Sequence, residues 1–490
     1  MEDTTIPNKT SNLVANLYDT PPKPISDDLK HSSSKNQHNN NENNIQVTKL
    51  AEDFEKCTTN FEIKQYKKRY FMLFLFAMCS AMNGFPQFQY TVVADIVSCY
   101  YGVEDSDISW TCVIYMVLFL PFVFPVMLLM DKKGLRITLI IGAVLNCLGS
   151  WVQCFSFSSD RFFVVMACQS IYALGQVFVL SLPPFIAGVW FGAGEVGLAC
   201  ALGVFGNQMG IALGFIIPPT VMTNNCANSV DIYYELSMIA YPMAGINTLL
   251  LIIICIAFEA KPDCFPSAAQ AAKEGNVTEY GKSLKRLCCD VPFVLLFIGY
   301  GLITGTYFAM STLMNEMVLF HFPGEEVDAG WLGAIMVFAG MVGSIFLGAM
   351  LDSTRKYKSI SLLVFIFSFM LMLSYTVVIK IVEKIWIQFI FFTFLGLIMT
   401  GYLPAGFDFG SEITYPEPEA MSSSLLNAST QLFSIILTNV SSPLLHKYGD
   451  QISNIFFSAC LFVGIIVMAC IKCELRRTKA GEGTPSSKLP

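Results

Sequence analysis

The chain has 490 residues, of which 54% are hydrophobic and 14% are charged, and its mean hydropathy is +0.55. A soluble domain would carry roughly 25% charged residues, so the composition excludes an ordinary soluble protein and indicates an integral membrane protein. The net charge of −7 says little about partners, because acidic residues dominate the tail and the predicted outer loops, and nothing indicates binding to nucleic acid.

The chain opens with a polar segment, residues 1–65, that is rich in Asn, Ser and Pro. Such a segment cannot bury enough apolar surface to fold, and it predicts a disordered tail. Apolar spans of about 20 residues follow, each long enough to cross a bilayer as a helix. They begin near Tyr70, Ile108, Ile137, Phe162, Val196, Leu236, Val291, Gly330, Ser359, Ile385, Met421 and Ile452. The sequence therefore predicts an all-α membrane protein with twelve transmembrane helices.

The two halves of the chain repeat each other faintly. Asp131 follows the second span and Asp352 follows the eighth, 221 residues later. Pro183 in the fourth span and Pro404 in the tenth are also 221 residues apart, and we expect both to act as hinges. Two six-helix bundles related in this way are typical of a transporter with its substrate site near the midplane of the membrane.

The distribution of Lys and Arg predicts the orientation. With a cytoplasmic N-terminus, the inner segments hold 19 of these residues and the outer loops hold 4, which places both termini inside. The predicted parts are the tail 1–65, an N-terminal bundle 66–258, a cytoplasmic linker 259–290, a C-terminal bundle 291–473 and a cytoplasmic tail 474–490. We expect a monomer in the plasma membrane. Cys99 and Cys226 fall in outer loops and could pair, although buried free thiols are the commoner use of cysteine in such spans.

The loops after the second and eighth spans contain candidate gating residues. Asp131 with Arg136 and Asp352 with Arg355 place a carboxylate and a base at a helix end, where they could hold one access state closed. The first copy, Asp131-Lys-Lys-Gly-Leu-Arg136, resembles the major facilitator signature G-x-x-x-D-R-x-G-R-R, and the second keeps G-x-x-x-D.

Two acids lie four residues apart in the tenth span, Asp408 and Glu412, so they share one helix face near the inner mouth. They could form a gate that pairs with inner-loop bases, or a relay for a cation or proton. The sequence favours the gate.

The centres of the spans contain no Lys or Arg, which disfavours an anionic substrate. Uncharged amides lie there instead, on the first, fifth and eleventh spans, and an aromatic pair on the seventh span occupies the place that matches position 87. An amide can orient a hydroxyl group, and an aromatic face attracts a cation. Helix-to-helix hydrogen bonding is the alternative role for such amides. The candidate substrate-binding residues are Asn83, Gln87, Gln208, Tyr307, Phe308 and Gln431.

Several long strings resemble the feline leukaemia virus subgroup C receptor-related transporters, a branch of the major facilitator superfamily. The resemblance runs from about Tyr70 to Arg477. The strings are VFGNQMGIALGF from Val204, GEEVDAG from Gly324, AGMVGSI from Ala339, TGYLPAGFDF from Thr400, EITYPE from Glu412, LLNAS from Leu425 and ELRR from Glu474. Members are described as carriers of choline and ethanolamine, and have also been discussed as haem transporters.

The family's choline pocket is only partly present. The resemblance assigns its two glutamines to Gln208 and Gln431 and its asparagine to Asn83. The family's tryptophan is Gln87 here, and its tyrosine is Phe308. A quaternary ammonium gains about 0.5–2 kcal/mol from each aromatic face around it, so this pocket suits a primary amine, another small polar cation or a zwitterion better than choline.

The sequence thus predicts carriage of a small organic cation or amino alcohol by alternating access. Uniport is favoured because no acid–base pair is visible inside the spans. Haem is an alternative, but the only histidines beyond the tail, His321 and His446, fall in predicted outer loops. A receptor or sensor that no longer transports is another. No nucleophile motif, phosphate-binding loop or metal-ligand spacing is present, so we expect no enzyme, cofactor or metal.

Overall fold

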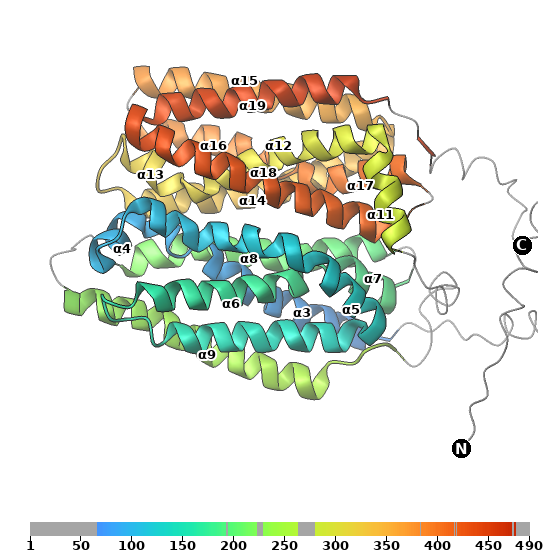
Figure 1. Cartoon of the computed structure of the whole chain (residues 1–490), viewed down its shortest axis with the longest axis horizontal. Helices are drawn as coiled ribbons and strands as arrows, with labels where there is room; N and C mark the ends of the chain where they lie inside the picture. Colours follow the sequence, from blue (N-terminus) through green and yellow to red (C-terminus); the bar gives the residue numbers. More distant parts are fainter. Residues whose placement is uncertain are drawn as a thin grey trace, which may run out of the picture. The chain divides into compact units, whose positions relative to one another are not determined.

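The computed structural model describes residues 66–192, 195–222, 229–262, 280–382, 384–415, 417, 419–472 and 475–476. They belong to one compact unit, Glu62–Pro490. The predicted tail 1–65, most of the predicted linker and nearly all of the tail 474–490 lie outside the described residues, so those boundaries stay predictions. Figure 1 shows the long helices side by side in two groups, α3–α9 and α12–α19. We name the end that the charge distribution predicts to face outward the outer end.

The N-terminal bundle contains seven α-helices and two short 3-10 helices within the described residues. They are α3 (Lys68–Gly84), η1 (Phe85–Gln87), η2 (Thr91–Val93), α4 (Ala94–Tyr101), α5 (Asp105–Gln153), α6 (Phe162–Leu180), α7 (Pro183–Trp190), α8 (Val196–Val221) and α9 (Ser229–Ala257). Helix α5 comprises two spans separated at Gly134, whose φ of 78° lies in the left-handed region that favours glycine.

The C-terminal bundle follows the same order of long helices. Its elements are α11 (Tyr280–Cys289), α12 (Val291–Thr312), α13 (Met314–Leu319), α14 (Glu326–Thr354), α15 (Tyr357–Ile381), α16 (Ile385–Met399), α17 (Tyr402–Thr414), α18 (Glu419–Tyr448) and α19 (Asp450–Cys470). Helix α11 lies within the predicted linker 259–290, so part of that segment is helical.

Eleven stretches among the described residues are long and apolar enough to cross a membrane. The prediction of an all-helical membrane protein is confirmed. The remaining predicted span, beginning near Met421, corresponds to α18, a helix of 30 residues that is long enough but too polar to be counted with the others. Its Ser, Thr, Asn and Gln side chains include many that are buried against protein rather than facing lipid.

The fourth and tenth spans are both interrupted at the predicted hinge positions. Helix α6 ends at Leu180, three residues before Pro183, where α7 begins. Helix α16 ends at Met399, and Pro404 is the third residue of α17. A proline cannot donate a backbone hydrogen bond, so each break lies where the sequence removes a donor. The breaks are confirmed, and motion about them stays a prediction.

Helix α3 packs backbone to backbone on α8, and α12 packs in the same way on α18. A Cβ atom added at Gly210 of α8 would overlap the carbonyl oxygen of Ala81 in α3. Contacts between the bundles run along α8 with α14 and along α5 with α18. The fifth and eleventh spans, α8 and α18, therefore each lie between their own bundle and the opposite one.

Candidate functional site

Two glutamines occupy matching places in the bundles, close to the middle of α8 and α18. Gln208 lies twelve residues after Val196, the first residue of α8, and Gln431 lies twelve residues after Glu419, the first residue of α18. Because a helix rises about 1.5 Å per residue, both side chains lie about 18 Å from the start of their helices.

Gln208 lies on the face of α8 that is directed toward the C-terminal bundle. Residues seven apart share a helix face, so Gln208 shares its face with Phe215, whose ring packs on Gly333 of α14. Gly206 and Gly210, two residues to either side of Gln208, lie on the opposite face, against α3.

Gln431 is directed away from its own bundle in the same manner. Ser429, two residues earlier, lies on the opposite face and donates a hydrogen bond to the carbonyl oxygen of Phe297 in α12. Leu445, four turns later on nearly the same face as Gln431, lines a cavity together with Asp105 of α5. The two glutamines therefore each face the opposite bundle.

The amide oxygens of these two glutamines are unpaired. Oε1 of Gln208 and Oε1 of Gln431 are buried without a hydrogen-bond partner. The residues keep 9% and 5% of their surface exposed, whereas Gln388 of α16, also buried and unpaired, keeps 0%. A buried, unpaired acceptor costs about 1–3 kcal/mol, so a ligand hydroxyl or ammonium that donates to it would recover this energy.

The amide nitrogen of Asn83 is engaged within its own bundle, whereas its Oδ1 is buried without a hydrogen-bond partner. Its Nδ2 donates to Oδ1 of Asn146 in α5 at 2.7 Å and to the carbonyl oxygen of Tyr172 in α6 at 3.1 Å. The residue is 0% exposed. These contacts are helix-to-helix hydrogen bonds, which the sequence analysis gave as the alternative role for such amides.

Gln87 lies beyond the end of the helix that contains Asn83. Helix α3 ends at Gly84, and Gln87 is the last residue of the 3-10 helix η1 that contains Pro86. Its Oε1 accepts a hydrogen bond from Nε2 of Gln176 in α6 at 2.8 Å. Sequence reasoning missed both Gln176 and Asn146, although their amides within apolar spans are the signal that could have drawn attention to them.

The aromatic candidates lie on α12, the helix that corresponds to α3. Tyr307 is buried and Phe308 is half-buried, and their rings meet edge to face with centroids 5.1 Å apart.

The structure describes the side chains of only some of the predicted gating residues in the loops. The side chains of Asp131 and Asp352 lie outside the described residues. Arg136 donates to the carbonyl oxygen of Cys255 at 2.8 Å, which caps the end of α9 in its own bundle. Arg355 ends α14 with a φ of 51° and is exposed.

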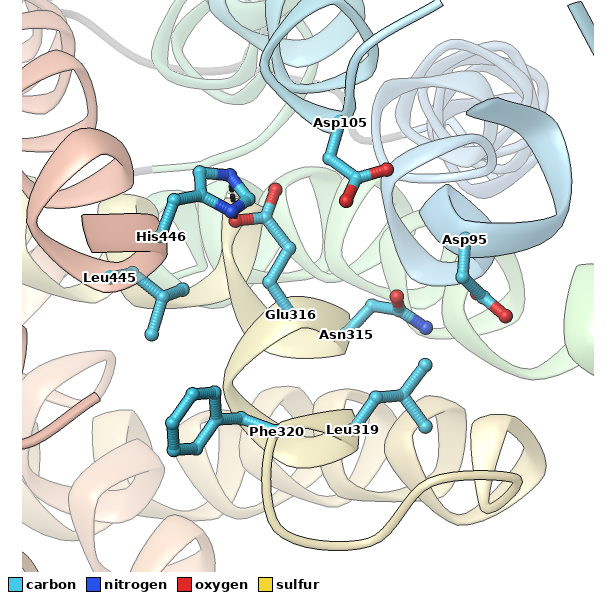
Figure 2. A pocket seen from close by; sticks show the side chains of 8 residues that line it. All are labelled: Asp95, Asp105, Asn315, Glu316, Leu319, Phe320, Leu445 and His446. Carbon is cyan, nitrogen blue, oxygen red and sulfur yellow. Dashed lines mark ion pairs between the residues drawn. The ribbon is translucent and has the colours of Figure 1, made fainter. Parts of the chain in front are cut away.

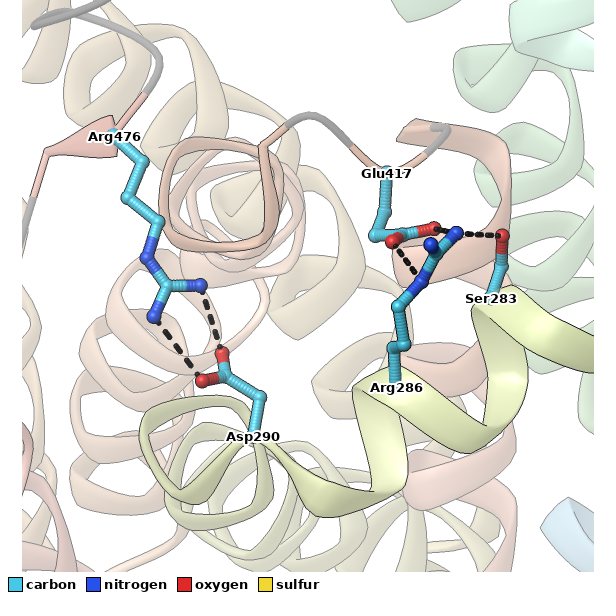
Figure 3. A network of polar contacts seen from close by, with 5 residues as sticks. All are labelled: Ser283, Arg286, Asp290, Glu417 and Arg476. Carbon is cyan, nitrogen blue, oxygen red and sulfur yellow. Dashed lines mark hydrogen bonds and ion pairs between the residues drawn. The ribbon is translucent and has the colours of Figure 1, made fainter.

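Asp408 is exposed and Glu412 is buried, both on α17 as expected from their spacing. Nearby, Figure 3 shows an ion pair that the sequence did not predict, between Arg286 of α11 and Glu417 at 2.6 Å. A second ion pair in the same view joins Arg476 and Asp290 at 3.1 Å. These contacts attach α11 to the segments around it.

Hydrogen bonds join the two bundles at the outer end. Ser109 of α5 donates to Oε1 of Glu316 in α13 at 3.1 Å, and Nδ2 of Asn315 donates to the carbonyl oxygen of Val92 at 2.7 Å. Cys99 near this end is disulfide-bonded, and its partner lies outside the described residues, as does Cys226.

Comparison with known proteins identifies the family. Residues 70–382 match the model of the Major Facilitator Superfamily. The zebrafish (Danio rerio) choline/ethanolamine transporter flvcr2a is 41% identical over 86% of this chain and 89% of its own. The cat (Felis catus) choline/ethanolamine transporter FLVCR1 is 43% identical over 86% and 76%, and human (Homo sapiens) FLVCR2, with the same description, is 42% identical over 87% and 81%.

Solved structures agree on the fold. A bacterial homolog of the human lysosomal transporter Spinster, in an inward-facing and unoccupied conformation, matches with a TM-score of 0.64 at 12% identity over 86% of this chain and 100% of its own. A D-xylose–proton symporter matches with a TM-score of 0.64 at 12% identity over 82% and 98%. The chain therefore belongs to the major facilitator superfamily and, within it, to the feline leukaemia virus subgroup C receptor-related transporters, and it is a transporter rather than an enzyme.

Proposed function

We propose that this transporter carries a small organic cation or amino alcohol of the choline and ethanolamine class by alternating access, as a uniporter. The observation that carries the proposal is the pair of unpaired amide oxygens on Gln208 and Gln431, each directed toward the opposite bundle. A ligand hydroxyl or ammonium group that reaches either oxygen would supply its missing donor. The names of the relatives support the same substrate class.

Alternating access draws support from the outer end, where hydrogen bonds join the two bundles. The interruptions at Pro183 and Pro404 supply bending points for the fourth and tenth spans. Uniport is proposed because the span centres contain no Lys or Arg to pair with a central acid. A monomer in the plasma membrane, with both termini in the cytoplasm, completes the proposal.

Uptake of radiolabelled ethanolamine and choline into proteoliposomes tests the proposal. We expect Gln208→Ala and Gln431→Ala each to lower uptake about 5- to 150-fold, because each removes an acceptor that is worth about 1–3 kcal/mol to the ligand. Gln388→Ala is the matched control, since this amide is buried but fully enclosed, and it should keep uptake near the level of the unchanged protein.

Unchanged uptake in both glutamine variants would refute the site. Folded protein that shows no saturable uptake of any amine would instead favour the receptor or sensor. For haem, His321 is already 2.8 Å from Asp450 and His446 is 3.4 Å from Glu316, so an axial ligand would have to leave a carboxylate partner. No observation favours haem as the substrate.

A further inference from the structure

A cavity of about 230 Å³ lies at the outer end, where the two bundles meet. Figure 2 shows carboxylates from both sides of the interface around it: Asp95 of α4, Asp105 of α5 and Glu316 of α13. The imidazole of His446, in the last turn of α18, completes the charged lining. Acids from the two bundles thus approach one another where hydrogen bonds join the bundles.

Glu316 is the acid of this cavity that contacts both bundles. One carboxyl oxygen accepts the hydrogen bond from Ser109 of the N-terminal bundle at 3.1 Å, and the other is 3.4 Å from Nε2 of His446 in the C-terminal bundle. Helix α13 is held to the C-terminal bundle through His321, whose ring nitrogen is 2.8 Å from Asp450 of α19. When the bundles separate at this end, Glu316 must therefore leave Ser109 and meet water.

The closed interface disfavours the ionised form of Glu316. Its side chain is 8% exposed, and burial, followed by the charge of Asp105, raises its pKa from 4.5 to about 8, while the hydrogen bond from Ser109 acts in the opposite direction. Asp95 lies near a second acid, Glu326 of α14, and contributes a carboxyl group rather than a base to the cavity. His446 is the only basic group that faces Glu316 among the described residues, and its side chain is 43% exposed to water.

We propose that Glu316 is a proton-binding switch in the outer gate, which binds a proton as the bundles close over it and releases that proton to the outer solution as they separate. The inference rests on the alternating access of the proposed function. Because the proton enters and leaves on the same side, no proton crosses the membrane, and the cycle remains a uniport whose rate depends on the outer pH.

The direction of the pH effect follows from the two protonation equilibria. In the open state Glu316 is solvated and returns to the ordinary glutamate range, whereas in the closed state its pKa is about 8. The closed state is therefore favoured most in acid, and this preference is lost as the pH rises through 8. Between pH 6 and pH 8 the ratio of closed to open protein falls by up to about 50-fold.

Cys112 offers a native reporter of the opening. The thiol is 0% exposed in α5, and Oγ1 of Thr312 in α12, across the interface, is 3.4 Å from its sulfur. Full-length protein in lipid nanodiscs is labelled with an anionic methanethiosulfonate, and modification of Cys112 is counted by mass spectrometry. Each rate is divided by that of the unfolded chain at the same pH, which removes the ionisation of the thiol itself.

We expect normalised labelling of Cys112 to rise by up to about 50-fold from pH 6 to pH 8, and Glu316→Gln to be slow and flat over this range. Ser109→Ala removes the bond that lowers the pKa of Glu316, so it should move the rise in Cys112 labelling to higher pH. This variant is the alternative test if Glu316→Gln does not fold. Glu325→Gln, an exposed acid outside the cavity, should behave like the unchanged protein.

A flat profile in the unchanged protein would overturn the switch. So would a rise that survives Glu316→Gln but disappears in His446→Gln, because the imidazole would then be the group that titrates. Choline and ethanolamine uptake is measured on the same samples. Absent uptake with a normal labelling profile contradicts the proposed substrate alone, and normal uptake with flat labelling contradicts the switch alone.

Discussion

The two bundles repeat one arrangement of helices but build one matching contact, α3 on α8 and α12 on α18, from different residues. In the N-terminal bundle most of the small residues at this contact are on the fifth span, where Gly210 of α8 lies against the backbone of α3 at Ala81. In the C-terminal bundle they are on the seventh span, where Gly305 of α12 lies against Phe433 of α18. A contact between two helices can be tight if either one has the glycine. The two bundles therefore share the close packing of this helix pair, although a different helix of the pair carries the glycine in each bundle.

The largest expected effect is the difference in stability between Gly210→Val and Gly305→Ala. A Cβ at Gly210 would overlap a backbone carbonyl, which cannot move without separating α3 from α8. We therefore expect the free energy of unfolding to fall by several kcal/mol, at or above the usual cost of overpacking, which is about 1–3 kcal/mol. At Gly305 the nearest atom, Cβ of Phe433, is 2.9 Å away, and a smaller loss is expected. Thermal unfolding in detergent measures both.

Gly348→Ala is the control for both substitutions, because nothing lies within 4 Å of a Cβ there. It should unfold at the same temperature as the unchanged protein or slightly higher, since alanine favours the helix. Equal losses at Gly210 and Gly348 would show that the close approach of α3 and α8 does not limit stability.

A second difference between the bundles is the chemistry that holds the first helix of each half, and Asn83→Ala tests it. This change leaves Oδ1 of Asn146 and the carbonyl oxygen of Tyr172 without their donor in a buried site, so we expect a loss of about 1–3 kcal/mol in the free energy of unfolding. Thr304→Ala removes a 2.8 Å bond to Thr430, whose hydroxyl keeps its bond to the carbonyl oxygen of Leu426. Its smaller expected loss is about 0.5–1.5 kcal/mol.

Denaturant or thermal unfolding followed by tryptophan fluorescence compares the two variants. A larger loss for Thr304→Ala than for Asn83→Ala would contradict the view that amides hold the N-terminal bundle more strongly than hydroxyls hold its counterpart.

The sequence predicted the order of helices and the interrupted spans because both depend on local composition, namely apolar length and the placement of Pro183 and Pro404. It could not predict which amides are engaged. Gln87 and Gln208 are both glutamines in apolar surroundings, but only the first has an amide partner, Gln176, 89 residues away in the chain. The bond between Ser109 and Glu316 spans 207 residues and is equally invisible to local reasoning.

The smallest expected effect concerns the matched positions 87 and 308, which differ most in their surroundings. Gln87 is buried and paired with Gln176, whereas Phe308 is half-buried beside Tyr307. Gln87→Trp together with Phe308→Tyr would add one electron-rich face, the indole, which is worth about 0.5–2 kcal/mol to a quaternary ammonium. We expect the ratio of kcat/KM for choline to that for ethanolamine to rise about 2- to 30-fold in proteoliposome uptake.

Phe308→Tyr alone is the control and should change this ratio little, because it adds only a hydroxyl. A ratio that stays constant in the double variant would mean that position 87 serves packing in the N-terminal bundle, and that the amides of Gln208 and Gln431, without an aromatic cage, set the preference for the substrate.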